Sequence, residues 1–312
     1  MLGAKQKKGN PAAVVTFILV MLVILGVILA SAFGSAKQID HGSLPPEPET
    51  TEPEEEFEYI DIAGADVNMG LLILVNSSHG YTHEETNLVF INDLKNDVYG
   101  LYSIELKAKS EVILKMNEML ADFNKATEID TVLVRDAYRT YEEQTELYNG
   151  KDHAFVAMPG HSEHESGLAI DFGIQKGSFD GTGDLAWFPE NSFRYGFIQR
   201  YTDVKKAITK IDAEPWHYRY IGEPHAFYIT QQNLCYEEYI DLLDRYMFLG
   251  EHLFIEGHDG KQYEIYKSPV DPTEPTTQLP VPRGKKYTVS GDNVNSFIVT
   301  IELEDDAPRK NP

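Results

Sequence analysis

The side chains best suited to chemistry are concentrated in one stretch, residues 161–172. It holds two imidazoles and three carboxylates within twelve residues. Its second half alternates the large apolar side chains Leu168, Ile170 and Phe172 with small residues and Asp171, which is the period of a half-buried strand. Asp171 should therefore project from the face opposite the apolar side chains. An isolated aspartate in that position is more often a hydrogen-bonded structural group than a ligand, so its role depends on its neighbours.

A second informative segment, residues 214–220, reads Glu-Pro-Trp-His-Tyr-Arg-Tyr. Its proline argues against a helix and its aromatic alternation predicts a strand, so an extended or bulged backbone brings Glu214 close to His217. A catalytic zinc takes three protein ligands and leaves a fourth position for water, and His164, Asp171 and His217 form such a set. An unligated Glu214 beside them would act as the general base. Spacing alone leaves this assignment open, because each pair of residues also occurs by chance.

Arg139 is a third candidate, placed between a predicted strand and a predicted helix. Residues 131–134 read as the strand, and Thr140 with Glu143 forms a capping box at the start of the helix. A guanidinium beside a helix N-terminus can hold an anion such as a carboxylate together with the free backbone N–H groups. The alternative is an ion-paired arginine at the surface, with Asp136 as its structural partner.

In their order and residue types, these segments resemble the sequence motifs of the VanY-type D-alanyl-D-alanine carboxypeptidases, which are zinc peptidases of the bacterial cell wall. The resemblance runs over residues 72–243 and rests on three matches: Tyr138-Arg139-Thr140-x-x-x-Gln144, Ser162-x-His164-x-x-Gly167-x-Ala169-x-Asp171, and Glu214-Pro-Trp-His217-Tyr-Arg-Tyr. Thr140 stands where serine is common in the family.

The resemblance implies a role for each matched side chain. The matched positions are the ligands of one Zn²⁺ ion (His164, Asp171 and His217), the catalytic base (Glu214), the arginine associated with the substrate carboxylate or the oxyanion (Arg139) and two substrate-side positions (Gln144 and Ser162). The implied activity is a D,D-carboxypeptidase that removes the terminal D-alanine from peptidoglycan stem peptides. The alternatives are an L,D-carboxypeptidase, a D,D-dipeptidase, a wall endopeptidase or a non-catalytic wall-binding module.

Other residues near these motifs carry plainer interpretations. His161 is an alternative to His164 as a ligand, but it lies outside the matched motif, so we expect it at the rim of the site or in solvent. Glu163 and Glu165 are expected to be solvated. Trp216 is expected to pack beside the ligand strand, and the alternative is an apolar wall that keeps water out of the site. Cys235 is the single cysteine, which excludes an intrachain disulfide and predicts a small buried side chain.

The resemblance and the order of the predicted elements imply an α+β fold, in which a small, mainly antiparallel sheet bears the ligands and helices pack over it. Residues 71–75 and 197–201 read as strands, and apolar side chains at helical spacing predict a helix that Ser110 caps. We expect this zinc peptidase domain to span residues 61–250. Residues 251–312 carry two hairpin signals and are expected to form a small β-rich extension.

The N-terminal region predicts attachment to a membrane. Residues 1–11 form a basic segment with three lysines, and residues 12–33 are uncharged and mostly apolar. About 20 apolar residues span a bilayer, whereas the core of a signal peptide has about 7 to 15, so we expect a retained single-pass anchor. The lysines place the N-terminus in the cytoplasm and the catalytic domain outside it. Cleavage at Ala30-Ser31-Ala32 is the alternative.

Composition limits the partners of the chain. Residues 34–60 mix prolines with glutamates and are expected to be a disordered acidic linker, because they cannot bury enough apolar surface to order themselves. The whole chain has a formal net charge of −23. This charge argues against nucleic acid as a partner, since phosphate contacts require clustered lysine and arginine. Peptidoglycan stem peptides and the membrane are the expected partners.

Overall fold

The structure is a computed structural model that describes residues 56–81, 83, 85–150 and 156–304. These residues belong to one compact unit, Glu55–Pro312. The expected anchor over residues 12–33 and most of the expected linker over 34–60 lie outside the described residues. Within the part that is described, no helix combines the length and apolar character needed to cross a bilayer.

The predicted α+β class is confirmed by five strands that form one sheet, in the order β3-β5-β6-β8-β7, and by the helices around it. The strands are β3 (Gly100–Leu101), β5 (Val132–Asp136), β6 (Ala169–Ile174), β7 (Phe197–Tyr201) and β8 (Glu214–Tyr220). Only the β3–β5 pair is parallel, and the other three pairs are antiparallel. The sheet is therefore mainly antiparallel, as expected. The first motif segment ends in β6, and the second forms the adjacent strand β8.

The helix α3 (Ser110–Thr127) closes the main apolar core of the sheet. Its buried side chains recur at helical spacing: Val112, Ile113, Met116, Met119, Leu120 and Phe123. Each fully buried apolar side chain contributes about 1.5–3 kcal/mol, so this face accounts for the position of the helix. The N-cap is Lys109 rather than the predicted Ser110, which is the first helical residue. A short pair of strands, β2 (Leu88–Phe90) and β4 (Lys107–Lys109), precedes the helix.

The remaining helices are short and connect the strands. They are α2 (Ile91–Leu94), α4 (Tyr141–Gly150), α5 (Trp187–Asn191), α6 (Lys206–Thr209), α7 (His225–Gln231) and α8 (Tyr236–Leu243), with the 3₁₀ helices η1 (Gly64–Asn68), η2 (Glu163–Ser166), η3 (Gly183–Ala186), η4 (Ser192–Tyr195) and η5 (Asp203–Lys205). The capping box predicted for α4 is present, because the Thr140 amide donates to the Glu143 carboxylate at 2.8 Å and the Glu143 amide donates to Thr140 Oγ1 at 3.1 Å.

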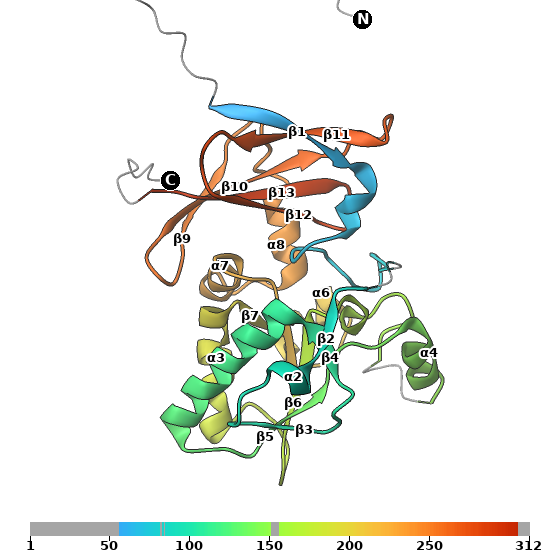
Figure 1. Cartoon of the computed structure of the whole chain (residues 1–312), viewed down its shortest axis with the longest axis vertical. Coiled ribbons are helices and arrows are strands. Elements are labelled where there is room, and N and C mark those ends of the chain that lie inside the picture. The colour runs from blue at the N-terminus through green and yellow to red at the C-terminus, as the bar shows by residue number, and fades with distance from the viewer. Residues whose placement is uncertain (1–55, 82, 84, 151–155, 305–312) are drawn as a thin grey trace, which may run out of the picture. The chain divides into compact units, whose positions relative to one another are not determined.

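The C-terminal region forms a second sheet, in the order β12-β13-β10-β9. Its strands are β9 (Leu253–Glu256), β10 (Gln262–Pro269), β12 (Tyr287–Gly291) and β13 (Ser296–Glu302), and all their pairings are antiparallel. Both predicted hairpins are therefore present. The helix α8 lies beside this sheet (Figure 1). Its apolar side packs there, since Ile240 and Leu243 share a buried cluster with Ile265 and Ile298.

The structure differs from the expected division between linker and peptidase domain at residues 60 and 61. The strand β1 (Phe57–Ala63) pairs antiparallel with β11 (Thr276–Pro282). Residues 57–60 were expected in the disordered linker and residues 61–63 in the peptidase domain, yet both belong structurally with the C-terminal region. The cause is the alternation of Ile60 and Ile62, which pack against the apolar cluster of that region despite the acidic composition around them.

The segment 71–75 is buried, as its apolar run indicates, but it is not the predicted strand. Its backbone groups find partners outside any strand ladder. The Leu72 amide donates to Ser290 Oγ at 2.8 Å. The Leu74 amide donates to the Asp292 carbonyl oxygen, and the Leu74 carbonyl oxygen accepts from Asn293 Nδ2. Arg219 Nη2 donates to the carbonyl oxygens of Leu71 and Ile73. This segment therefore joins the C-terminal sheet to the end of β8.

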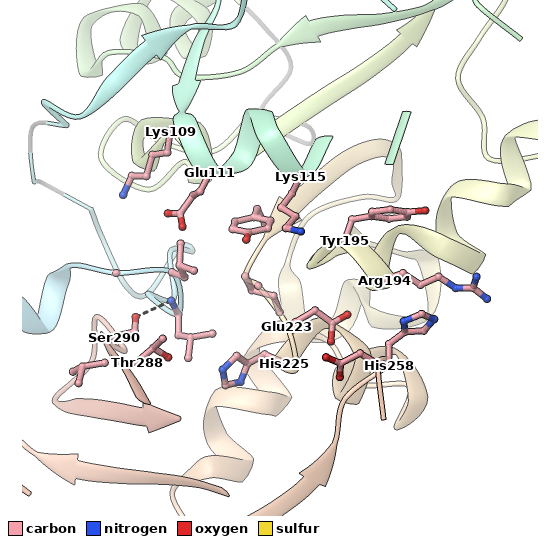
Figure 2. A pocket seen from close by; sticks show the side chains of 18 residues that line it. Lys109, Glu111, Lys115, Arg194, Tyr195, Glu223, His225, His258, Thr288 and Ser290 are labelled. Carbon is pink, nitrogen blue, oxygen red and sulfur yellow. Dashed lines mark hydrogen bonds between the residues drawn. The ribbon is translucent and has the colours of Figure 1, made fainter. Parts of the chain in front are cut away.

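A cavity of about 630 Å³ lies between α3, the end of β8 and the turns of the C-terminal sheet (Figure 2). Charged groups of both signs line it, including Lys115, Arg194 and Glu223. Burial raises the pKa of Glu223 to about 7, with a smaller contribution from Asp259. None of the residues that the sequence analysis assigned to the site lines this cavity.

Candidate active site

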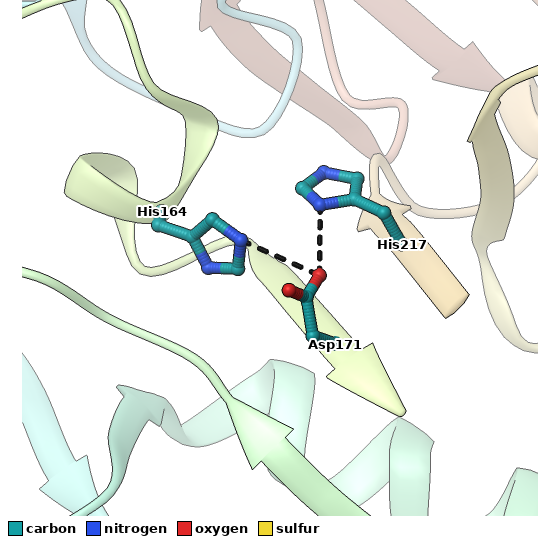
Figure 3. Close-up of side chains that lie close together, drawn as sticks. All are labelled: His164, Asp171 and His217. Carbon is teal, nitrogen blue, oxygen red and sulfur yellow. Dashed lines mark hydrogen bonds and ion pairs between the residues drawn. The ribbon is translucent and has the colours of Figure 1, made fainter. Parts of the chain in front are cut away.

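The three predicted metal ligands converge on one point (Figure 3). Register places Asp171 on β6 directly opposite His217 on β8, and His164 comes from η2, just before β6. Asp171 Oδ1 lies 2.9 Å from His217 Nδ1 and 3.4 Å from His164 Nε2. One ligand atom from each residue lies within 4.8 Å of the other two, and no other such group is found in the described residues.

The local fold of η2 turns His164 toward the sheet. Ser162 is the N-cap, and its Oγ accepts from the His164 amide at 3.4 Å. The Glu165 carboxylate accepts from the Ser162 amide at 3.0 Å and from the Gly160 amide at 2.9 Å, which completes a capping box. The expectation that Glu165 is solvated is therefore wrong. Gly167 ends the helix at φ 66°, a left-handed conformation that glycine adopts without steric cost.

The hydrogen bond of His164 suits a cation between this ring and Asp171. His164 Nδ1 lies 2.5 Å from the Ala137 carbonyl oxygen, which only accepts, so this nitrogen carries the ring proton. Nε2 of the neutral ring then directs its lone pair toward Asp171. A carboxylate and two imidazoles are donors that zinc binds, with room for water at the fourth position. By donor type and proximity, the set fits a Zn²⁺ ion.

The predicted base, Glu214, lies beside this group at the start of β8. Its Oε2 is 3.7 Å from His217 Nδ1, and the residue is only 6 % exposed. Burial raises the pKa of Glu214 to about 7, the negative charge of Asp171 adds to the rise, and His217 opposes it. A carboxyl with a pKa near neutrality can both take up and release a proton, which general acid–base catalysis requires.

Arg139 follows β5 and lines the cavity that also contains the three ligands and Glu214. Its Nε is 3.2 Å from Asp136 Oδ2, which confirms the expected ion pair, and its backbone amide donates to the His164 carbonyl oxygen at 3.2 Å. Its Nη1 donates to Gln144 Oε1. Gln144 is fully buried and its Nε2 donates to the Ala157 carbonyl oxygen at 2.7 Å. Gln144 thus orients Arg139 through a hydrogen bond. Its predicted contact with substrate stays a prediction.

The cavity that holds these groups has a volume of about 230 Å³. Its walls combine the polar site residues with apolar groups, and among the lining residues are Ser162, Ile211, Leu147, Trp216 and Tyr201. Trp216 packs against the core beside the ligand strand, as expected. His161 is not among the lining residues, and its Nδ1 lies 2.7 Å from the Asn76 carbonyl oxygen.

Two residues at this site carried no functional signal in the sequence. Tyr201 lines the cavity, and its ring centroid lies 5.0 Å from that of His217. Glu163 was expected in solvent and is instead 2 % exposed, so that expectation is wrong. Burial alone would raise the pKa of Glu163, but the guanidinium groups of Arg200 and Arg219 hold it well below its usual range. The positions of Tyr201 and Glu163 at the site depend on partners from other segments of the chain, so the local sequence did not indicate them.

Comparison with known proteins identifies relatives over most of the chain. The family model of the D-alanyl-D-alanine carboxypeptidase VanY matches residues 105–223, which include every predicted site residue. A D-alanyl-D-alanine carboxypeptidase of Enterococcus faecium is 34% identical over 239 residues, which are 75% of this chain and 76% of that protein. The bifunctional D-Ala-D-Ala dipeptidase and carboxypeptidase VanXYC of Enterococcus gallinarum is 36% identical over 195 residues, or 56% of this chain and 96% of that protein.

Among solved structures, the vancomycin-resistance D,D-dipeptidase VanXYg, in complex with a D-Ala-D-Ala phosphinate analogue, matches with a TM-score of 0.69. The sequences are 28% identical, and the match covers 79% of this chain and 99% of that one. It therefore extends beyond the expected peptidase region. The family inferred from the motifs is confirmed: this chain belongs to the VanY family of D-alanyl-D-alanine carboxypeptidases.

Proposed function

We propose that this protein is a zinc-dependent D,D-carboxypeptidase that removes the terminal D-alanine from peptidoglycan stem peptides. The observation that carries the proposal is the convergence of His164, Asp171 and His217 within 4.8 Å, in a cavity that Glu214 and Arg139 also line. One cavity thus contains a metal-ligand set, an unligated carboxyl group and a guanidinium. A module that only bound the wall would have no need of that carboxyl group.

The chemistry divides among these groups. A zinc ion bound by the three ligands supplies Lewis-acid chemistry, because it polarises a carbonyl group and lowers the pKa of water. Glu214 takes the proton from the attacking water and transfers it to the nitrogen of the departing D-alanine, while the C–N bond breaks and a C–O bond forms. Arg139 holds the terminal carboxylate, or the oxygen on which negative charge develops, in a fixed orientation.

The test is a digest of muropeptides with the purified full-length chain, followed by mass spectrometry. Release of one D-alanine from pentapeptide stems, its loss with a chelator and its recovery with zinc would support the proposal. Zinc content, measured by elemental analysis, should approach one ion per chain. Glu214→Gln should bind zinc normally and lose turnover, and full turnover in that variant would exclude Glu214 as the base.

A D,D-dipeptidase is the second candidate function. It is favoured by the relatives, since VanXYC is described as bifunctional and VanXYg as a D,D-dipeptidase. The discriminating measurement compares kcat/KM for free D-Ala-D-Ala with that for a pentapeptide stem under the same conditions. A preference for the free dipeptide would assign the dipeptidase. Release of D-alanine from tetrapeptide stems alone would instead assign an L,D-carboxypeptidase, and cleavage within cross-links would assign an endopeptidase.

We also propose that residues 12–33 anchor the chain in the cell membrane as a single span, with the N-terminus in the cytoplasm and the catalytic domain outside. The lysines of residues 1–11 and the uncharged, mostly apolar run that follows support this orientation. A catalytic domain outside the membrane can reach the cell wall. Protease added to spheroplasts should degrade the catalytic domain, and its protection until the cells are lysed would exclude this orientation.

A further inference from the structure

We propose that Glu163 is a positioning residue of the metal centre: it fixes the tautomer of His217 so that Nδ1 faces the metal, and the buried pair Arg200–Glu237 holds Glu163 in place. The inference rests on the proposed zinc-dependent function. It assigns a role to a side chain that lies next to His164 in the sequence but outside the set of ligands.

The contact between Glu163 and His217 determines the tautomer. Glu163 Oε2 lies 3.3 Å from His217 Nε2, on the edge of the ring away from Asp171. An ionised carboxylate only accepts hydrogen bonds, so Nε2 must carry the proton in the neutral ring. The lone pair then lies on Nδ1, which is 2.9 Å from Asp171 Oδ1. Hydrogen bonding of the non-ligating nitrogen is a common means of orienting a metal-binding histidine.

Glu163 is itself held by charges that are removed from solvent. Its side chain and that of Arg200 are both 0% exposed, and Arg200 Nε donates to Glu163 Oε1 at 2.9 Å. Arg219 Nη1 lies 3.2 Å from the same oxygen, while the other guanidinium nitrogens of Arg219 donate to backbone carbonyls. With both oxygens engaged and no water-accessible surface, Glu163 has no room to adopt a different orientation toward His217.

Glu237 completes the charge balance of this cluster. Arg200 donates from Nη1 and Nη2 to the two oxygens of Glu237, at 2.8 and 2.6 Å. Two guanidinium groups thus face two carboxylates. Glu237 is on α8, and its Oε1 also accepts from Asn76 Nδ2 at 3.2 Å. The helix α8, which packs on the C-terminal sheet, is therefore connected to His217 through Glu237, Arg200 and Glu163.

The arrangement also explains why η2 affects two ligands. The same 3₁₀ turn carries His164, which reaches the metal group directly, and Glu163, which reaches it through His217. Glu165, on the same turn and also buried, contacts only backbone amides of Gly160 and Ser162 among its hydrogen-bond partners. Glu165 is therefore a matched control: it is a buried carboxylate of the same helix that does not contact a ligand.

The test measures zinc affinity of the full chain by competition with a chromophoric chelator. In Glu163→Gln, the amide NH₂ must face either His217 or Arg200, so one contact becomes donor against donor. We expect zinc binding to weaken by about 10- to 100-fold, as for other residues that orient metal ligands. Glu165→Gln should lower the melting temperature, because its side chain loses one of the two oxygens that accept from backbone amides. It should leave zinc affinity within about threefold of wild type, because glutamine also completes a capping box and so keeps the turn that carries His164. Wild-type affinity in Glu163→Gln would overturn the proposal.

A spectroscopic measurement covers the case in which Glu163→Gln fails to fold. Nitrogen-15 NMR of the histidine rings in the zinc-loaded wild-type chain should show His217 protonated at Nε2, and a proton on Nδ1 would overturn the proposal. Glu237→Gln should weaken zinc binding less than Glu163→Gln does, and unchanged affinity would remove the Arg200–Glu237 pair from it. If the wild-type chain itself binds no zinc, the proposed function fails first, which separates the two outcomes.

Discussion

Asp171 and His217 face each other across β6 and β8, with Asp171 Oδ1 2.9 Å from His217 Nδ1. The candidate metal site thus depends on the register of two adjacent antiparallel strands. A slip of one residue would move either side chain to the opposite face of the sheet. The positions of these two ligands are therefore determined by the sheet, which allows them to be tested one at a time.

Replacement of His217 by alanine should abolish metal binding without unfolding the sheet. The variant removes one of three donors, and we expect zinc affinity to fall by at least about 100-fold, beyond the loss typical of residues that only orient ligands. His161→Ala is the matched control, because His161 lies close in sequence to a ligand but contacts the Asn76 carbonyl oxygen. Equal zinc affinity in the two variants, measured by chelator competition, would contradict the assignment of His217.

Replacement of Arg139 by lysine should reduce kcat/KM while leaving zinc content unchanged. Lysine keeps the charge but loses the planar fork that binds a carboxylate through two hydrogen bonds, and the expected loss is on the order of 10²-fold. Arg135→Lys, a change at an exposed position of β5, is the control. A substrate with an amidated C-terminus separates binding of the terminal carboxylate from stabilisation of the oxyanion. If Arg139 binds the carboxylate, wild type and Arg139→Lys should cleave this substrate equally well. If Arg139 stabilises the oxyanion, the variant should remain slower.

The metal-ligand candidates could be predicted because each motif is local in sequence. Ser162 to Asp171 lies within one short segment, and the alternation of β6 indicates which face carries Asp171. Glu163 is in the same segment, yet its burial was missed. Its partner Arg200 is 37 positions away, on β7, and no local pattern reports that these side chains meet. The sequence therefore indicates the ligands but not the charges that hold them.

The fold shows the same division between local and distant information. The α3 helix and both C-terminal hairpins follow from periodicity and turn residues, and they were predicted. The strand β1 was missed because it pairs, among the described residues, with β11, which is far along the chain and rich in proline and threonine. Residues 71–75 were predicted as a strand because they are apolar, but Leu72 donates its amide to Ser290 Oγ, 218 positions away. Burial could be predicted there, and hydrogen-bond partners could not.

Replacement of Asp292 by alanine should destabilise the peptidase region together with the C-terminal sheet. Asp292 is fully buried, accepts three backbone N–H bonds through Oδ1 and places Oδ2 2.9 Å from Lys267 Nζ. Removing one partner of a buried ion pair typically costs about 3–5 kcal/mol, and because Lys267 Nζ keeps Asp244 Oδ1 at 2.6 Å, we expect a loss near the lower end of that range. Because the Asp292 carbonyl oxygen also accepts from the Leu74 amide, we expect one cooperative transition in urea at a lower midpoint. Two separate transitions would show that the sheet unfolds independently.

His225 should make the protein less stable as the pH falls below about 6.5. Its ring is buried, with Nδ1 2.6 Å from the Tyr239 hydroxyl and Nε2 3.1 Å from Thr300 Oγ1, and burial lowers its pKa from 6.5 to about 3. Between those values the unfolded chain binds a proton that the folded chain does not, so stability is lost as pH decreases. The loss is about 1.4 kcal/mol per pH unit, or roughly 2 kcal/mol between pH 6.5 and pH 5.

Comparison with His225→Gln isolates this contribution to the free energy of unfolding. Glutamine retains hydrogen-bonding groups but does not titrate, so the difference between the two proteins removes the effects of other groups, including Glu223. This subtraction is needed because burial raises the pKa of Glu223 to about 7. That shift makes the folded state more stable as pH falls from 7 toward 4.5, which opposes the effect of His225. Urea unfolding at pH 5.0 and 7.5 should show a wild-type loss larger by roughly 2 kcal/mol than that of the variant. Equal losses in both proteins would mean that the buried ring does not couple folding to protonation.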